Sequence, residues 1–250
     1  MYLADIHTHS IASGHGTSCT ISDMAKEAGR KGMKLLGITD HGPGTLASGT
    51  SSYFRGLPFC PRKRFGVEVL YGIELNILNV QGHVDLSDEL LSNLDYAIIS
   101  MHSQNYTSGT VKENTLAYQN AMKHPAVKVL GHCDNPAFPV DYHALAYTAS
   151  RENVIFEINE ASLTPGGYRG DTRANNAEIL RCCLKYQLPI VKNLCLADGK
   201  TKREYAKQLV RQINSENPGA KERMFTAIIS QNLDGWQESA FPYKKGKKNE

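Results

Sequence analysis

Short apolar runs alternate with longer amphipathic segments along most of this chain, at a spacing of roughly 30 residues. Most of the runs are rich in Val, Ile and Leu, and they are too short for helices of ~10–12 residues, so they predict buried parallel strands. The seven runs are Tyr2–Ile6, Lys34–Thr39, Val67–Ile73, Tyr96–Ser100, Val127–Gly131, Val154–Ile158 and Leu188–Leu194.

Five segments between the runs have the length and pattern of helices: Ile21–Lys31, Asp88–Asn93, Lys112–Lys123, Tyr142–Ser150 and Asn175–Tyr186. Repeated strand–loop–helix units are typical of an α/β fold. Seven repeats favour a closed or nearly closed barrel. The alternative, an open doubly wound sheet, would place a G-x-G-x-x-G loop after the first strand, and the sequence has none there.

The polar residues that follow the predicted strands share one chemistry. Histidines or carboxylates close the first five strands in turn: His7 and His9, Asp40 and His41, Glu74, His102, and His132. In a parallel βα barrel, the carboxyl ends of the strands meet at one face, where active sites are built. The sequence therefore predicts a cluster of imidazoles and carboxylates at that face.

This set of residue types suits metal ions. His7 and His9 are two residues apart, so in a strand both imidazoles point to the same side. His15 lies in a glycine-flanked loop that can fold over the same face, and Glu74 could bridge two ions. Imidazole and carboxylate ligands suit zinc, manganese or iron. Two such ions ~3.5–4 Å apart would generate a hydroxide nucleophile for phosphoester hydrolysis.

The other histidines, His83, His124 and His143, lie in turns or at helix ends, and we expect them on the surface. Cys133, next to His132, is expected to be a small buried residue rather than a ligand. The longest irregular segment, from His41 to Arg64, is predicted to be a functional loop.

Length and charge limit the function classes. The 250 residues favour a single domain over residues 1–250, with 41% hydrophobic and 21% charged residues. The net charge of +3 comes from the tail at 244–250, which holds four lysines and one glutamate; without it the balance is 24 − 24 = 0. We expect this tail to be mobile. A neutral body gives no support to nucleic-acid binding.

Six cysteines without a C-x-x-C pair indicate reduced thiols rather than a disulfide scaffold. The N-terminus has no basic segment followed by an apolar run, and no apolar stretch reaches 18 residues. We therefore expect a cytoplasmic protein without a membrane partner. The oligomeric state is left open.

Five motifs in order resemble the PHP (polymerase and histidinol phosphatase) superfamily: His7-Thr8-His9-Ser10, Gly37–Gly42, Gly72–Asn76, Ser100-Met101-His102 and Gly131–Pro136. The resemblance is to the stand-alone bacterial phosphatases of this superfamily and covers residues 1 to about 191. It implies a distorted (βα)7 TIM-like barrel with a trinuclear, usually zinc, centre. His7, His9 and Glu74 would hold the first ion. Glu74 would bridge to a second, held with His102 and His132, and His15 and His41 would hold the third.

The sequence departs from the resemblance after the last predicted strand. The family pattern there is Ser-Asp-Ala-His, whereas this chain has Leu194–Ala197, or Ala197-Asp198-Gly199-Lys200 after a three-residue shift. The shift would supply Asp198 as a ligand but places Lys200 where histidine belongs. Residues 192–250 diverge from the family. We therefore expect two ions to be retained, a third to be loosely held, and activity to be reduced.

The sequence predicts a phosphatase that hydrolyses small phosphomonoesters through a metal-activated hydroxide, using two to three zinc ions, with manganese or iron as alternatives. Asp198 or a metal-bound water is the candidate general acid, and Arg62 is the candidate phosphate contact. Two alternatives stay open. One is a nuclease of the same superfamily that acts on phosphodiesters, and the other is a metal-binding homologue impaired by its altered last motif.

Overall fold

The computed structural model describes residues 3–164 and 169–192 of the chain. All of them belong to one compact unit, Met1–Leu196. Asp198 and the tail at 244–250 lie outside the described residues. The expectation of a single domain over 1–250 therefore stays a prediction.

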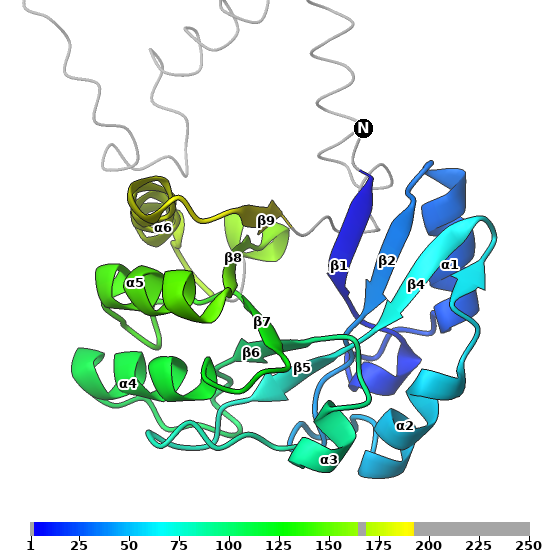
Figure 1. Ribbon diagram of the computed structural model, residues 1–250, viewed down its shortest axis with the longest axis horizontal. Coiled ribbons are helices and arrows are strands. Elements are labelled where there is room, and N and C mark those ends of the chain that lie inside the picture. The colour runs from blue at the N-terminus through cyan, green and yellow to red at the C-terminus, as the bar shows by residue number, and fades with distance from the viewer. Residues whose placement is uncertain (1–2, 165–168, 193–250) are drawn as a thin grey trace, which may run out of the picture. The chain divides into compact units, whose positions relative to one another are not determined.

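The described strands form two sheets (Figure 1). One has the order β1-β2-β4-β3, from β1 (Ala4–Thr8), β2 (Leu35–Ile38), β3 (Lys63–Arg64) and β4 (Val67–Tyr71). The other has the order β5-β6-β7-β8-β9, from β5 (Ile73–Asn76), β6 (Ala97–Ser100), β7 (Val127–Leu130), β8 (Ile155–Ile158) and β9 (Ile190–Lys192). All neighbouring strands are parallel except the edge strand β3, which pairs antiparallel with β4.

Each of the seven apolar runs forms a strand, as the sequence predicts. The run Val67–Ile73 crosses from one sheet to the other, because β4 ends at Tyr71 and β5 begins at Ile73. Within residues 3–164 and 169–192, β1 pairs with β2 and β9 pairs with β8, and no ladder joins β9 to β1. The mixed α/β fold with parallel sheets is confirmed, but a closed TIM-like barrel is not.

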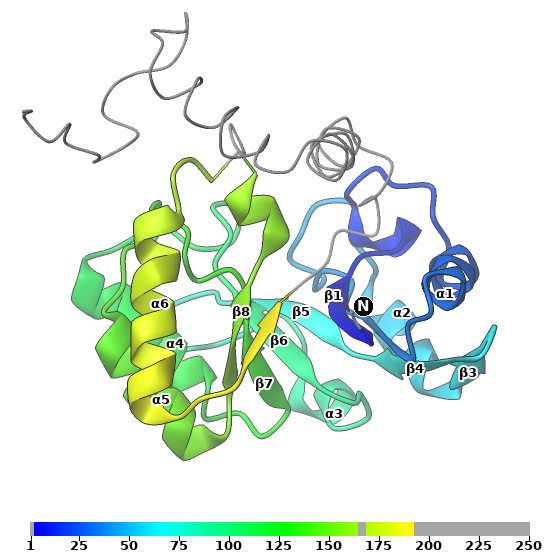
Figure 2. The same ribbon diagram turned by 90° about the horizontal axis from the view of Figure 1, so that it is seen from above.

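The helices lie on the outside of the sheets (Figure 1). Next to the first sheet are α1 (Ile21–Arg30) and α2 (Ser51–Gly56), and along the second are α4 (Val111–Ala121), α5 (Tyr142–Glu152) and α6 (Arg173–Tyr186), with α3 (Asp88–Leu91) ahead of β6. Three short 3-10 helices complete the described part: η1 (Ile11–Ser13), η2 (Leu57–Phe59) and η3 (Glu160–Leu163). Figure 2 shows the same arrangement from above.

Local signals explain where these helices begin and end. A capping box joins Thr20 to Asp23 at the start of α1, and another joins Thr110 to Glu113 at the start of α4. The side chain of Asp141 caps α5, which ends at Asn153 in the left-handed conformation. All five predicted helices are present, with ends shifted by at most a few residues.

The segment from His41 to Arg64 is more ordered than predicted. It contains α2, η2 and the edge strand β3. Phe54 and Leu57 are both buried and belong to the main core cluster. The glycine- and serine-rich composition hides this short apolar anchor, so the prediction of a long irregular loop holds only for its first part.

The sheets meet around a small apolar interior. Tyr96, Ile98 and Val129 are buried there, and four partly buried residues pack against them: Ile6, Leu70, Ile155 and Val191. Strands of both sheets contribute to this cluster. Close packing demands glycine at position 37, because a Cβ there would lie 2.9 Å from Ile6 Cα and would collide with the hydroxyl of Tyr96, which donates a hydrogen bond to Ile6 O.

In the part of the chain that the structure describes, none of the helices has the length and hydrophobicity needed to cross a membrane.

We expect Gly37→Ala to lower the free energy of unfolding by about 1–3 kcal/mol, because the added methyl group overpacks the interior between β1, β2 and Tyr96. Urea denaturation checks this value. Gly56→Ala is the matched control, since a Cβ at Gly56 meets no atom within 4 Å. Equal unfolding free energies for the two variants would contradict the packing argument.

Candidate metal centre

The carboxylate of Glu74, in β5, lies at the centre of the predicted histidine cluster. Its side chain is completely buried. A buried charge is costly unless other groups compensate it, and the strand ends around Glu74 supply five imidazoles at ion-pair distance. The two carboxylate oxygens face different subsets of these imidazoles.

One oxygen, Glu74 Oε2, faces the ends of the first two strands. It lies 3.2 Å from His7 Nε2, 3.3 Å from His9 Nε2 and 2.9 Å from His41 Nδ1. His7 and His9 point to the same side, as their spacing in a strand predicts. Ligand atoms of His7, His9 and Glu74 form one group in which all atoms lie within 4.8 Å of one another.

The other oxygen, Glu74 Oε1, faces the ends of β6 and β7. It lies 2.7 Å from His132 Nε2 and 3.5 Å from His102 Nε2. His132 has a backbone φ of 27°, in the left-handed region that non-glycine residues rarely adopt. Such strain costs on the order of 1–3 kcal/mol and is common where a side chain must be aimed precisely.

A third group is formed at the rim of the cluster. His15 Nε2 lies 2.6 Å from His41 Nε2, and His9 completes a group of three with them. His15 follows η1 and Gly14, which has a φ of 79° and packs against the backbone of Leu46. The structure therefore brings together all seven predicted ligands: His7, His9, His15, His41, Glu74, His102 and His132.

The geometry of this cluster fits metal ions. Zinc–ligand bonds of ~2.0–2.1 Å place two ligands of a tetrahedral ion about 3.3 Å apart, close to the separations of His7 and His9 from Glu74 Oε2. Glu74 Oε2 and His41 Nδ1 are buried, and neither makes a hydrogen bond within the described residues. Lone pairs that converge in a buried site without donors between them are what a shared cation would satisfy.

The protonation states are those that metal binding needs at most of these positions. Burial would raise the pKa of Glu74, but the charges of His41, His7 and His102 outweigh it and hold that pKa well below its usual value. Burial lowers the pKa of His132 to about 4 and that of His9 well below 6.5. A neutral imidazole at His9 and at His132, beside an ionised Glu74, is the ligand form that zinc requires.

His7 differs from the other ligands because it has a second carboxylate partner. Burial would lower its pKa, but Glu157 and Glu74 together raise it well above the usual value. His7 Nδ1 lies 2.7 Å from Glu157 Oε1, and Glu157 Oε2 accepts a hydrogen bond from the backbone N–H of His132 at 2.9 Å. One buried carboxylate thus positions ligands from two strands.

The sequence interpretation did not include Glu157 in the site. Its signal was present, since Glu157 is a carboxylate within the apolar run Val154–Ile158, and a buried charge requires a partner. The sequence interpretation also did not include Asn76, whose Oδ1 lies 2.7 Å from His102 Nδ1 and so positions that imidazole. Asp40 does not join the imidazoles. It accepts hydrogen bonds from Ser10, which tie the ends of β1 and β2 together, and one from Tyr53 of α2.

Of the two other predicted site residues, Asp198 lies outside the described residues, and Arg62 is not brought to the cluster. The guanidinium of Arg62 forms a salt bridge with Asp95, which precedes β6, whereas His102 follows the opposite end of that strand. His83, His124 and His143 lie away from the cluster, as expected, and Cys133 is buried. His143 belongs to a separate group with Glu178 and the buried Cys182.

A buried arginine lies near His132 that the sequence interpretation did not include. Arg169 precedes α6, its side chain is largely buried, and its charge contributes to the low pKa of His132. Its Nη1 donates hydrogen bonds to Ser162 Oγ at 3.0 Å and to Asn159 Oδ1 at 3.4 Å. Asn159 and Ser162 both follow β8, so Arg169 is held at the same end of the sheet as the histidines. No regular spacing in the sequence indicates this placement.

Comparison with known proteins finds a matching family model and several relatives. The model of the PHP domain family matches residues 5–161. The chain is 37% identical over 190 residues to a Clostridium novyi protein named "Probable phosphatase", covering 76% of this chain and 77% of the relative. It is 41% identical over 182 residues to a protein of the same name from Caldicellulosiruptor saccharolyticus, covering 73% and 74%.

Among solved structures, the fold is similar to that of histidinol phosphate phosphatase from Lactococcus lactis, which was determined in complex with zinc, L-histidinol and phosphate. The TM-score is 0.53, the identity is 16%, and the alignment covers 77% of this chain and 86% of that one. At this identity the likeness concerns the fold.

We expect Glu157→Gln to weaken zinc binding by about 10–100-fold, because the amide no longer holds the His7 imidazole with a negative charge. Competition with a chromophoric chelator measures the affinity. Glu68→Gln, the same change on the exposed face of β4, is the control. If both variants bind zinc as tightly as the unmodified protein, Glu157 has no role in positioning His7.

Proposed function

Because this chain belongs to the PHP domain family, we propose that it is a metal-dependent phosphatase that hydrolyses small phosphomonoesters. The observation that carries this proposal is the placement of Glu74, with His7 and His9 at one carboxylate oxygen and His102 and His132 at the other. A bridging carboxylate between two sets of imidazoles is the arrangement expected of a two-metal hydrolytic site.

The proposed ligands for the first ion are His7, His9 and Glu74, and those for the second are Glu74, His102 and His132. When bound, such ions supply a hydroxide nucleophile and neutralise the charge of the phosphoryl group. Zinc is the proposed metal, with manganese or iron as alternatives, because the donors are nitrogen and oxygen atoms. The chain's own contribution is to keep Glu74 ionised and to aim the imidazoles through Glu157 and Asn76.

A third ion would be held by His15 and His41, with His9 nearby. His15 is exposed, and the pKa of its imidazole is lowered by partial burial and by the charge of His41. Two histidines form a weaker site than the sets around Glu74, because affinity falls steeply with each missing ligand. We therefore propose two ions that are firmly bound and a third that is exchangeable. Asp198, the further ligand or general acid that the sequence predicts, lies outside the described residues and stays a prediction.

The substrate's phosphate needs a cation besides the metals, and we propose Arg169 for this contact. Its largely buried guanidinium is fixed by Ser162 and Asn159 and acts electrostatically on His132. A guanidinium forms paired hydrogen bonds with phosphate oxygens. Arg62, which its sequence position suggested, is instead engaged with Asp95.

The decisive experiment measures metal content and hydrolysis of an aryl phosphate on the same preparation. We expect two or more zinc ions per chain, and we expect His102→Ala to lose at least ~100-fold in kcat, since it removes a ligand of one ion. His83→Ala, an exposed histidine on a turn, is the control and should retain full activity. Cys182→Ser weakens any zinc site that Cys182 forms with His143 and Glu178, so the zinc content of this variant corrects the number of ions assigned to the cluster around Glu74.

Two outcomes of this experiment would refute the phosphatase proposal. Bound zinc without turnover of any phosphomonoester identifies an impaired metal-binding homologue. Turnover of phosphodiesters and oligonucleotides in preference to monoesters identifies a nuclease.

A second variant pair distinguishes the two arginines. We expect Arg169→Met to raise KM for the aryl phosphate and Ki for inorganic phosphate by about tenfold or more, because a charge-assisted hydrogen bond of ~1.5–3 kcal/mol is lost. Arg62→Met should leave both constants unchanged. Thermal unfolding of both variants separates loss of binding from loss of fold. If only Arg62→Met weakens phosphate binding, the assignment of Arg169 is wrong.

A further inference from the structure

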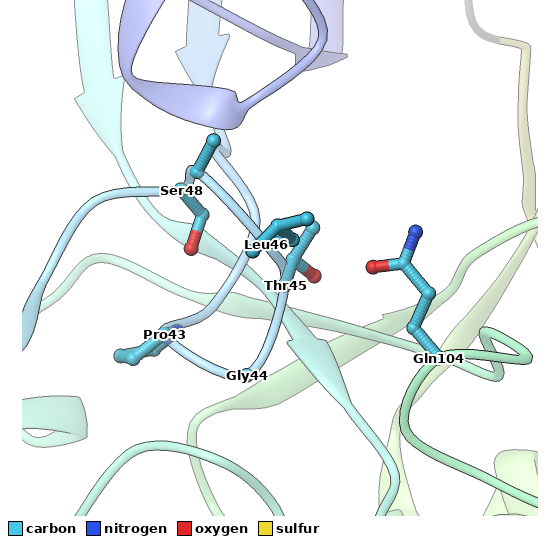
Figure 3. A pocket seen from close by; sticks show the side chains of 7 residues that line it. Pro43, Gly44, Thr45, Leu46, Ser48 and Gln104 are labelled. Atoms are coloured by element: carbon cyan, nitrogen blue, oxygen red, sulfur yellow. The ribbon is translucent and has the colours of Figure 1, made fainter.

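An open pocket lies beside the proposed metal centre (Figure 3). Its volume is about 670 Å³, within the range of ~300–1,000 Å³ that is typical of small-molecule sites. One wall is the loop after β2, from Pro43 to Ser48, and the other is Gln104, after β6. Figure 3 shows the carboxamide of Gln104 directed across the pocket toward Thr45 and Leu46.

Both walls begin next to proposed metal ligands. Pro43 comes two residues after His41, and Gln104 comes two residues after His102. A chain of hydrogen bonds connects the pocket to the centre, because Asn76 Nδ2 donates to Thr45 Oγ1 at 3.0 Å while Asn76 Oδ1 lies 2.7 Å from His102 Nδ1. On the other side, the loop packs against Gly14, next to His15. A phosphoryl group at the centre would therefore have its ester substituent within reach of this pocket.

The lining of the pocket carries no charge. The residues that line it within the described part of the chain are Pro43, Gly44, Thr45, Leu46, Ala47, Ser48 and Gln104. Among the described residues, the carboxamide of Gln104 has no hydrogen-bond partner, so it is available to both donors and acceptors. The hydroxyl of Ser48 donates to Gly42 O at 2.8 Å. The pocket thus offers neutral polar groups beside the apolar surface of Pro43, Leu46 and Ala47.

The carboxylate under this loop is already committed to holding it. Asp85 accepts hydrogen bonds from Gly44 N at 2.8 Å, Asn76 N at 2.9 Å and Asn76 Nδ2 at 2.5 Å. A Cβ at Gly42 would collide with this carboxylate, so the loop backbone covers it closely. An ammonium group in the pocket would therefore meet no carboxylate among the described lining residues, because Asp85 lies under the loop and is held by these three donors.

We infer that this pocket binds the leaving group and selects phosphomonoesters of uncharged, hydroxyl-bearing alcohols over those of cationic amino alcohols. The inference rests on the proposed phosphatase function and deepens it. Hydroxyl groups of the alcohol pair with the Gln104 carboxamide and the Thr45 hydroxyl, while its carbon skeleton contacts Leu46 and Pro43. Sugars and nucleosides share this chemistry.

The test compares kcat/KM for substrates that differ in one group. Glucose 6-phosphate and glucosamine 6-phosphate are matched in size. Where the first has a hydroxyl group the second has an amine, which is protonated when the assay pH lies below the pKa of that amine. We expect the zinc-loaded protein to prefer glucose 6-phosphate by about five- to tenfold. Adenosine 5′-monophosphate, assayed in parallel, shows whether a nucleoside or a sugar is the better neutral leaving group.

Variants of Gln104 connect the preference to the pocket. Gln104→Glu should shift the ratio of the two hexose substrates toward glucosamine 6-phosphate by about five- to tenfold, because it adds the missing carboxylate. Gln104→Met is the matched neutral control. It should lower kcat/KM for glucose 6-phosphate without raising kcat/KM for glucosamine 6-phosphate. Zinc content and turnover of an aryl phosphate, measured for every variant, correct for changes at the centre.

Three results would overturn the inference. Two of them leave the phosphatase function intact: preference of the unmodified protein for glucosamine 6-phosphate, and an equal effect of Gln104→Glu on both substrates. The third is the absence of aryl phosphate hydrolysis by the zinc-loaded protein, which removes the proposed function and the inference together.

Discussion

The burial of the Glu74 carboxylate is the constraint on which the rest of this structure depends. An ionised carboxylate without solvent exposure is stable only where positive or donor groups surround it. Five imidazoles from four strand ends approach its two oxygens, and the charges of His41, His7 and His102 hold its pKa low against the effect of burial. The same crowding creates the proposed metal site, so the folding requirement and the chemistry rest on one side chain.

The backbone at Glu74 also joins the two sheets. Its N–H donates to Asp40 O at 3.1 Å, and its carbonyl accepts from Gly42 N at 2.8 Å. The loop after β2, which belongs to the first sheet, is thereby fixed to β5 of the second. His41 on this loop consequently has a defined position, and the pairing of β5 with β6 places His102, which follows β6, next to it. The pocket proposed for the leaving group lies between the continuations of these two segments, so its shape depends on the same junction.

A second layer of polar residues determines how precisely the imidazoles are aimed. Glu157 contacts His7 and the backbone of His132, and Asn76 contacts both His102 and the loop at Thr45. Each of these residues connects segments that are far apart in the sequence. Replacing Glu157 therefore affects two ligands, and replacing Asn76 affects one ligand and one wall of the pocket.

The sequence by itself predicted strands at the seven apolar runs, five of the helices and the seven proposed ligands, because each depends on a local pattern. Apolar runs form strands, and in parallel strands the residues at the carboxyl ends must share one face, so His7, Glu74 and His132 could be grouped without coordinates. Tertiary structure decided the rest. Glu157 and Arg169 belong to the site through interactions with residues that are distant in the sequence. Arg62 does not belong to it, because its guanidinium forms a salt bridge with Asp95. The segment from His41 to Arg64 forms α2 and η2 because the side chains of Phe54 and Leu57 are buried in the hydrophobic core. Such long-range pairings depend on where the fold brings the chain, and no local spacing encodes them.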